Sequence, residues 1–132
     1  SGNWENTQSI LERQWDDFRV FAGSEHFLLQ TMRAGGAGCI SATANINPNA
    51  IYNLYKEWKS DRADNLQEQL NQVRTVLESY PMIPALKSVI SYYSNHPDWT
   101  IVRPPFISLE KETQKELIQK LKSLGFAMLN LD

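Results

Sequence analysis

The chain has 132 residues, the length of one ordinary domain or of part of a larger one. Its apolar content of 42% can fill a core, which argues against disorder, and its net charge of −2 gives no electrostatic reason to expect nucleic acid or anionic lipid. It has no apolar run of about 18 residues that could span a membrane, and a single cysteine, Cys39, rules out an internal disulfide and fits a reducing, cytoplasmic setting.

The N-terminal third of the chain is predicted to alternate between helices and short strands. Residues 3–15 are expected to form a helix that Asn3 caps and whose apolar stripe includes Trp15. Residues 18–21 follow as a strand that is covered on both faces, because its apolar residues do not alternate strictly. Gly23 ends this strand.

A second helix and strand are predicted directly after the first pair. Ser24 is the expected N-cap of a helix to about Ala34, which Gly35-Gly36 ends. Residues 38–41 then form a second short buried strand, and Asn47-Pro48 marks the start of the next helix. Because each strand precedes a helix, the two strands should be parallel neighbours joined by a right-handed crossover.

The remainder of the chain is predicted to be helical. A helix starts near Asp64, and Pro81 and Pro84 bracket the turn before the next helix. That helix ends near Asn95, and residues 98–108 form an extended, ordered loop.

The last helix is expected to open at Ser108 and to close at Gly125. Its predicted inward-facing residues are Leu117, Leu121 and Leu124. The element order is therefore helix, strand, helix, strand, and then four helices, and two strands alone do not make a stable sheet.

Strand order also selects candidate site residues. In parallel α/β proteins the active face lies at the C-terminal ends of the strands. The candidates are the residues that follow the two predicted strands: Gly23, Ser24, Glu25 and His26, and Ile40, Ser41, Ala42, Thr43 and Asn45. The absence of a side chain at Gly23 would let a ligand approach the backbone closely.

Several segments of the chain, above all the glycine-containing stretch after each predicted strand, resemble a known enzyme family. The string VFAGSEHFLLQTMRAGGAGCISATANINP, residues 20–48, resembles the last two strand–helix units of the dihydrodipicolinate synthase / N-acetylneuraminate lyase family. The opening SGNWENT resembles the stretch just after the family's Schiff-base lysine. IPALK, residues 83–87, and VRPPFISL, residues 102–109, resemble its C-terminal helical region. The resemblance covers nearly the whole chain.

The resemblance implies a fold and a reaction. The fold is α/β, the C-terminal part of a (β/α)8 TIM barrel, in which residues 1–60 supply the last two strands with their helices and residues 61–132 a C-terminal helical extension. Enzymes of the family are class I lyases that form a Schiff base between a lysine and pyruvate or a related 2-oxo acid, with no metal or organic cofactor. We therefore expect a cytoplasmic enzyme that acts by aldol condensation, aldol cleavage or dehydration, completed by a missing N-terminal part of the barrel and assembled as a homotetramer.

The resemblance also assigns substrate-binding positions to the strand tips. The turn after the family's seventh strand matches Gly23, Ser24 and Glu25, and the eighth-strand position whose main-chain carbonyl faces the catalytic centre matches Ile40, beside Ser41. The Schiff-base lysine, the catalytic tyrosine and the carboxylate-binding turn belong to segments that this chain lacks. The lysine is expected a few residues upstream, so the chain alone is expected to be inactive and to contain no catalytic residue.

The same positions bear on the choice of substrate. The sialic-acid lyases of the family carry an acidic pair after the seventh-strand glycine and a serine in the eighth-strand loop, where this chain has Glu25, His26 and Ala42. These differences argue against sialic acid. They leave open the dihydrodipicolinate synthase reaction and several sugar-acid aldolase or dehydratase reactions.

Each candidate residue also has a purely structural interpretation. Glu25 suits the first turn of a helix, His26 suits a half-exposed packing position, and Cys39 suits a small buried apolar position. His26 and His96 lie far apart without ligand spacing, so no metal site is expected. The lysines sit on predicted helices or at their ends, and none resembles a nucleophile of lowered pKa: Lys56, Lys59, Lys87, Lys111, Lys115, Lys120 and Lys122.

An alternative from a different class is a non-catalytic helical interaction module. The helix-rich C-terminal half favours it, whereas the two buried strands that precede those helices do not. Strong hydrogen-exchange protection of the Val20 and Ile40 amides in the isolated chain would favour the independent module. Rapid exchange there would favour a fragment that needs the missing half.

Overall fold

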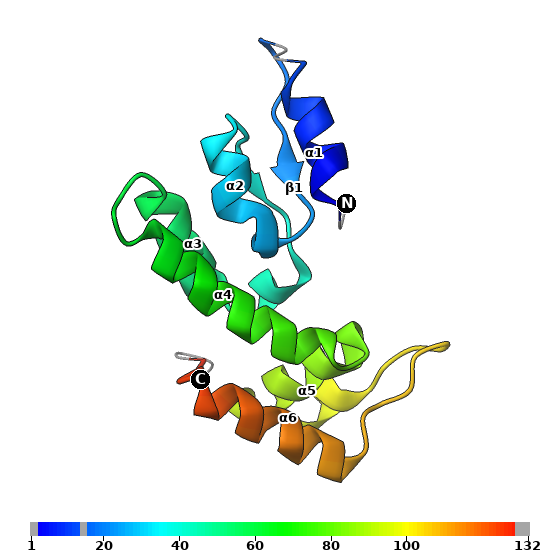
Figure 1. The fold of residues 1–132 in the computed structure, drawn as a ribbon. Helices are drawn as coiled ribbons and strands as arrows, with labels where there is room; N and C mark the ends of the chain where they lie inside the picture. The colour runs from blue at the N-terminus through cyan, green and yellow to red at the C-terminus, as the bar shows by residue number, and fades with distance from the viewer. Residues whose placement is uncertain (1–2, 14–15, 129–132) are drawn as a thin grey trace. The chain divides into compact units, whose positions relative to one another are not determined.

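The structure is a computed structural model that describes residues 3–13 and 16–128. The elements, with η marking a 3-10 helix, are α1 (Trp4–Leu11), β1 (Phe21–Ala22), η1 (Glu25–Phe27), α2 (Leu28–Arg33), β2 (Gly38–Cys39), η2 (Ala42–Asn45), α3 (Pro48–Glu57), α4 (Ala63–Glu78), α5 (Met82–Ser94), η3 (Pro97–Thr100) and α6 (Lys111–Ser123) (Figure 1). The predicted order of helix and strand, twice, followed by four α-helices is confirmed. Within the described ranges no helix is both long enough and apolar enough to cross a bilayer.

The chain forms two compact units, and the boundary between them falls inside α4. One unit reaches to Asn71 and the other begins at Gln72. The first therefore holds both strands, and the second holds α5 and α6. The expected division of the family fold at residue 60 concerns the complete barrel and stays a prediction.

The two strands of the first unit pair in parallel, which confirms the predicted relation. The register places Phe21 opposite Gly38 and Ala22 opposite Cys39. Both strands are only two residues long, so the predicted spans 18–21 and 38–41 are wrong in extent. The predicted burial is also wrong, because Phe18 and Phe21 are half exposed and Ile40 is 74% exposed: no further strand covers them in the described chain.

A side-chain cap explains where α1 begins. The Asn3 side-chain oxygen accepts a hydrogen bond from the Asn6 amide at 3.1 Å, so Asn3 caps α1 as predicted. The helix ends at Leu11 rather than near residue 15, and the predicted stripe residue Trp15 lies outside the described residues.

The glycine pair that ends α2 serves two purposes. Gly35 adopts a φ of +86°, a left-handed conformation that glycine tolerates best. At Gly36 an added Cβ would lie 2.3 Å from Cγ2 of Thr31, so only glycine lets the chain pass this close to α2. The pair thereby turns the chain from α2 back toward β2.

Helices α2, α3 and the start of α4 enclose the core of the first unit. α2 packs against both α3 and β2. The buried core residues at helical spacing are Leu28, Leu29, Met32, Ile51, Leu54, Ala63 and Leu70. This core holds α2, and hence the loops at both ends of the crossover, in a fixed position.

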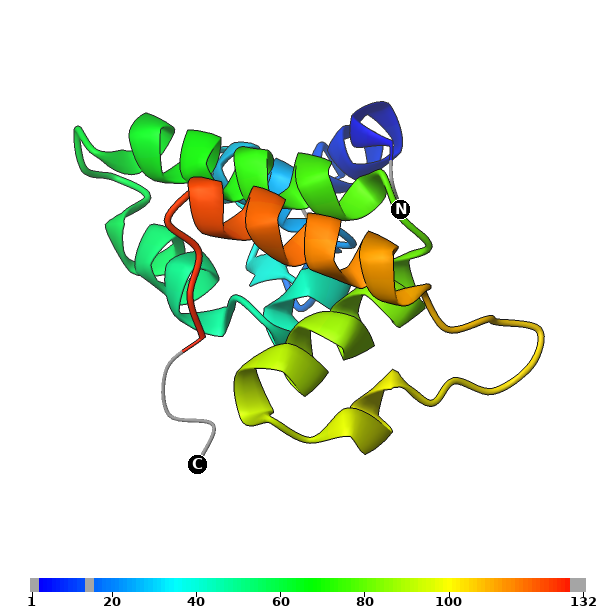
Figure 2. The same cartoon turned by 90° about the horizontal axis from the view of Figure 1, so that it is seen from below.

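In the second unit α5 and α6 pack against each other (Figures 1 and 2). Leu117 and Leu121 are fully buried as predicted, whereas Leu124 is 40% exposed because it is the C-cap residue, beyond the last turn of α6. Tyr93 donates its hydroxyl to the carbonyl of Phe126 at 3.0 Å, and the two rings meet edge to face. These contacts hold the segment after α6 against α5.

Two predicted helix boundaries in the second unit are wrong and one is confirmed. Pro84 does not bracket a turn but lies in the first turn of α5, where its missing N–H removes no intrahelical bond. The last helix does not begin at Ser108. The Ser108 hydroxyl donates a hydrogen bond to the carbonyl of Thr100, and Glu110 is the N-cap residue of α6. The predicted end of α5 is confirmed, with Asn95 in the left-handed conformation at φ 54°.

Candidate functional site

The parallel pairing of β1 and β2 brings the ends of both strands to one edge. The Ile40 amide donates to the carbonyl of Ala22 at 2.8 Å, and the Ala37 amide donates to the carbonyl of Val20 at 2.8 Å. The loops that follow the two strands therefore begin side by side. This is the edge at which the sequence places its five substrate-binding candidates.

The loop after β1 turns at once into η1. Gly23 is exposed at this turn. Ser24 is buried, with extended backbone, and its hydroxyl accepts a hydrogen bond from the His26 amide at 3.2 Å. The predicted N-cap role of Ser24 is thus confirmed. Its hydroxyl is turned toward the backbone that it caps.

Glu25 is the only acidic residue among the buried polar residues of the described chain, with 2% of its surface exposed. Its two carboxylate oxygens accept hydrogen bonds from the hydroxyls of Ser41 and Thr43, which lie 3.0 Å from each other. A carboxylate removed from water needs such charge-assisted donors, since an unpaired buried charge is costly. The three side chains therefore join the loop after β1 to the loop after β2.

A glutamine on α4 fixes the same loop from another direction. The Gln67 side chain donates to the carbonyl of Glu25 at 3.0 Å and accepts from the Leu29 amide at 2.9 Å. It also donates to the side chain of Asn71 at 2.9 Å. Gln67 thus satisfies the Leu29 amide at the start of α2 and gives the Glu25 carbonyl a second donor besides the Leu28 amide.

An apolar hollow of about 510 Å³ lies beside the two strands. It is lined by aromatic rings of Phe21, Tyr52 and Tyr55 and by the strand residues Gly38 and Cys39, among others. The Ile40 side chain is also exposed at this end of β2. The described unit thus presents an apolar face next to the strand tips.

Three titratable groups show how their surroundings shift a pKa. Burial, together with the nearby charge of Glu25, raises the pKa of the half-buried Cys39 thiol to about 11, so Cys39 stays protonated near neutral pH. Hydrogen bonding to Glu116 and Tyr80 raises the pKa of Lys120, and a bond to Tyr92 raises that of Lys122. Neither lysine has the lowered pKa that a Schiff-base nucleophile requires.

The structure gathers all five predicted substrate-binding residues at the strand tips, but sequence reasoning missed two neighbours that hold them. Thr43 was recognised as a residue of the second loop, not as a partner of Glu25. Gln67 gave no sequence signal, because its partners are 38 and 42 residues away. In the described ranges no three His, Cys, Asp or Glu side chains converge as a metal site.

A family model matches this chain along almost its whole length. The model describes the dihydrodipicolinate synthetase family and matches residues 1–124. The chain belongs to this family. Its fold is accordingly the C-terminal part of a (β/α)8 barrel, comprising the last two strands with their helices and a C-terminal helical extension.

Individual members of the dihydrodipicolinate synthetase family show the extent of the match. A 4-hydroxy-tetrahydrodipicolinate synthase from Methanopyrus kandleri is 31% identical over 95% of this chain and 42% of its own length. The crystal structure of Escherichia coli K12 YagE, a family member in complex with pyruvate, superposes with a TM-score of 0.83 at 25% identity, over 96% of this chain and 45% of YagE. Dihydrodipicolinate synthase from Agrobacterium tumefaciens gives 0.79 at 26% identity, over 94% and 41% of the two chains. The chain thus spans about two fifths of the length of the relatives that it matches.

Proposed function

We propose that this chain supplies the substrate-facing tips of the last two strands of a class I, Schiff-base lyase that acts on pyruvate or a related 2-oxo acid. The observation that carries the proposal is the membership of residues 1–124 in a lyase family, combined with a parallel strand pair whose tips share one hydrogen-bonded edge. YagE, which is similar over 96% of this chain, binds pyruvate. The reaction would be an aldol condensation, an aldol cleavage or a dehydration.

The proposed chemistry needs a lysine amine that attacks the carbonyl carbon of the 2-oxo acid. Water leaves, and the protonated imine that forms withdraws electrons from the carbon at which the bond is made or broken. We assign this lysine, and the tyrosine that moves protons, to segments outside the chain. Hydrogen bonds raise the pKa values of Lys120 and Lys122, the opposite of what a nucleophilic lysine needs.

The five tip residues would contribute in two ways. Gly23 and Ile40 are exposed at the edge and would meet the substrate through their backbone groups. Ser24, Glu25 and Ser41 are buried, and their hydrogen bonds to the local backbone and to one another would hold that backbone in the productive position. The substrate-binding set therefore includes both contact and positioning residues.

The rest of the barrel would cover the apolar face beside β1 and β2. Phe18, Phe21 and Ile40 are large apolar side chains that a further layer of barrel strands would shield from water. We further propose that the complete enzyme works in the cytoplasm as a homo-oligomer, a tetramer as is common in the family, without a metal or organic cofactor.

Borohydride trapping tests the proposal directly. Pyruvate and borohydride are added to the chain alone and to a protein in which the N-terminal barrel segment of the Methanopyrus kandleri relative precedes this chain. Peptide mass spectrometry should find a reduced pyruvate adduct only in the second protein, on a lysine outside these 132 residues. An adduct on a lysine of this chain would overturn the assignment, as would no adduct in a joined protein whose circular dichroism shows a folded barrel.

A further inference from the structure

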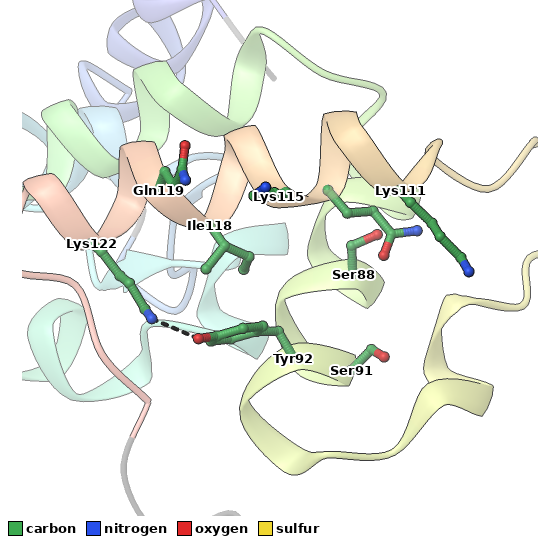
Figure 3. Close-up of a pocket in the computed structure, with 9 residues that line it drawn as sticks. Ser88, Ser91, Tyr92, Lys111, Lys115, Ile118, Gln119 and Lys122 are labelled. Atoms are coloured by element: carbon green, nitrogen blue, oxygen red, sulfur yellow. Dashed lines mark hydrogen bonds between the residues drawn. The ribbon is translucent and has the colours of Figure 1, made fainter.

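The second unit contains a groove that the proposed reaction does not use. It lies between α5 and α6 and has a volume of about 490 Å³, within the range typical of small-molecule sites. Figure 3 shows its walls: Ser88, Ser91 and Tyr92 come from α5, and Lys111, Ile118 and Lys122 are among the residues from α6. The groove is therefore built entirely within one compact unit.

Three lysines line the groove along one face of α6. Lys111, Lys115 and Lys122 stand at positions i, i+4 and i+11, with Ile118 at i+7, so helical periodicity places all four side chains within a narrow stripe. Such a stripe is the usual place for apolar residues that pack on a neighbouring helix. Here its charged members border an open groove instead.

No carboxylate lines the groove beside its three lysines in the described chain. Among the described residues, none of those lining the groove carries a carboxylate, and none of the three lysines forms an ion pair. α5 itself contains no Asp or Glu. Lys122 donates to the hydroxyl of Tyr92 at 2.6 Å, an uncharged partner that leaves its charge available.

A serine of α5 lines the groove and has no partner for its hydroxyl in the described part of the chain. Ser88 is 3% exposed, and its side chain points from α5 toward α6 (Figure 3). Its hydroxyl makes no hydrogen bond within the described part of the chain, although Ser94, one and a half turns later on the same helix, bonds to the carbonyl of Ile90 at 2.7 Å. The groove thus offers a hydroxyl that is free to donate a hydrogen bond to a ligand.

We propose that this groove binds a small organic anion with an apolar body. The carboxylate or phosphate of the ligand would lie between Lys111, Lys115 and the Ser88 hydroxyl, and its apolar part would lie on Ile118 and the ring of Tyr92. A nucleic acid or membrane surface fits less well, because the basic face is a short concave stripe in a chain whose net charge is −2. The site shares no residue with the strand tips and does not depend on the lyase activity.

A titration of the 132-residue chain followed by amide NMR shifts tests this site. The probes are phenyl phosphate, inorganic phosphate, which lacks an apolar body, and benzyl alcohol, which lacks the charge. Phenyl phosphate should cause saturable shifts at amides of α5 and α6, and should bind more tightly than the other two probes. Absence of saturable shifts there, or equal binding of benzyl alcohol, would overturn the proposal.

Two lysines on α6 provide a matched pair of variants. Lys122 and Lys120 each donate to a tyrosine hydroxyl, at 2.6 Å to Tyr92 and 3.1 Å to Tyr80, but only Lys122 lines the groove. Lys122 borders the end of the groove where the apolar part would lie, and its charge would attract the phosphate without contacting it. Lys122→Gln should therefore raise the Kd for phenyl phosphate about threefold, while Lys120→Gln should leave it unchanged. An equal effect of the two variants would show only general attraction to lysines and would contradict the site.

Removal of the Ser88 hydroxyl gives an independent check. Ser88→Ala changes the side-chain volume little and leaves every lysine in place, so the chain should fold as before. The Kd for phenyl phosphate should rise about tenfold, the expected loss of one hydrogen bond to a charged group at the weaker end of its range. An unchanged Kd with the shifts still at α5 and α6 would contradict the role of Ser88 and the binding geometry proposed above.

Discussion

The two compact units differ in what they bury. Six of the seven buried polar side chains of the described residues lie in the first unit: Thr7, Ser24, Glu25, Thr31, Ser41 and Thr43. The described part of the second unit buries apolar side chains and a single polar residue, Ser88. The first unit thus depends on specific hydrogen bonds around its strand tips, whereas the second depends on packing, and its one buried polar residue lines the groove.

This difference relates structure to function. The hydrogen bonds among Glu25, Ser41 and Thr43, here called the Glu25 group, are directional and hold a backbone in one geometry, which the proposed substrate-binding edge would need. Apolar packing fills space with little dependence on direction, which suits a helical support. We expect changes to the two kinds of contact to differ in size, and the four variants below run from the largest expected effect to the smallest.

A cavity in the second unit should give the largest loss of stability. Leu121 is fully buried on α6, so Leu121→Ala removes apolar contacts and leaves a void that should lower the free energy of unfolding by about 3 kcal/mol. Leu124→Ala, at a half-exposed position three residues later, should cost well under half as much. Urea denaturation of the two variants measures the difference, and equal losses would show that packing does not dominate this unit.

A change of one hydroxyl should suffice to destabilise the first unit. Thr43→Val preserves the side-chain shape but removes a donor to the Glu25 carboxylate, which should cost about 2 kcal/mol. Thr31→Val is the matched control, because the buried hydroxyl of Thr31 has no hydrogen-bond partner within the described chain. Denaturation should show that this control is neutral or stabilising. If both variants lost the same stability, the Glu25 group would not be the reason.

The thiol of Cys39 should make the stability of the first unit depend on pH in the alkaline range, with a smaller effect than that of Thr43→Val. The pKa of Cys39 is raised to about 11 in the folded chain. The thiol of the unfolded chain has a pKa of about 8.5, so the folded chain holds this proton more tightly. Its contribution to stability should be complete below that lower value and should be lost as the pH rises toward 11. The difference in thermal midpoint between the wild-type chain and Cys39→Ala, followed from pH 7 upward, isolates this group from other titrations; a difference that stays constant would contradict the raised pKa.

An exposed ion pair should contribute least. Arg33 donates two hydrogen bonds to Asp64 at 2.9 and 2.8 Å, and these lower the pKa of the Asp64 carboxyl, but both side chains face water. Asp64→Asn should therefore leave the unfolding midpoint at neutral pH unchanged within error. A clear loss, comparable with that of Thr43→Val, would mean that surface charge and not the buried hydroxyls holds the first unit.

The sequence predicted features that depend on near neighbours. Asn3 and Ser24 cap their helices through residues two or three positions away, and Gly35 and Asn95 adopt left-handed conformations where a helix must end. The parallel relation of the strands also followed, since a strand, helix and strand in close succession permit few other arrangements. These features need no knowledge of distant contacts.

Features that depend on distant partners could not be read from the sequence. Glu25 bonds to hydroxyls 16 and 18 residues away, and Gln67 reaches back about 40 residues to the same loop. The strand lengths were predicted wrongly for a related reason. Phe18 and Ile40 have the apolar character of buried strand residues, but the paired strands extend for only two residues each and leave both side chains exposed. The placement of the candidate residues at the strand tips was therefore predictable, but not the hydrogen bonds that hold them there.

The central claim is that the first unit, and not the second, meets the 2-oxo acid. Hydrogen exchange in the joined protein described above, with and without pyruvate, tests it most directly. We expect pyruvate to slow exchange at the amides of residues 23–25 and 40–41 and to leave residues 111–122 unchanged. Protection confined to α5 and α6, or no protection at the strand tips of a protein saturated with pyruvate, would contradict the account.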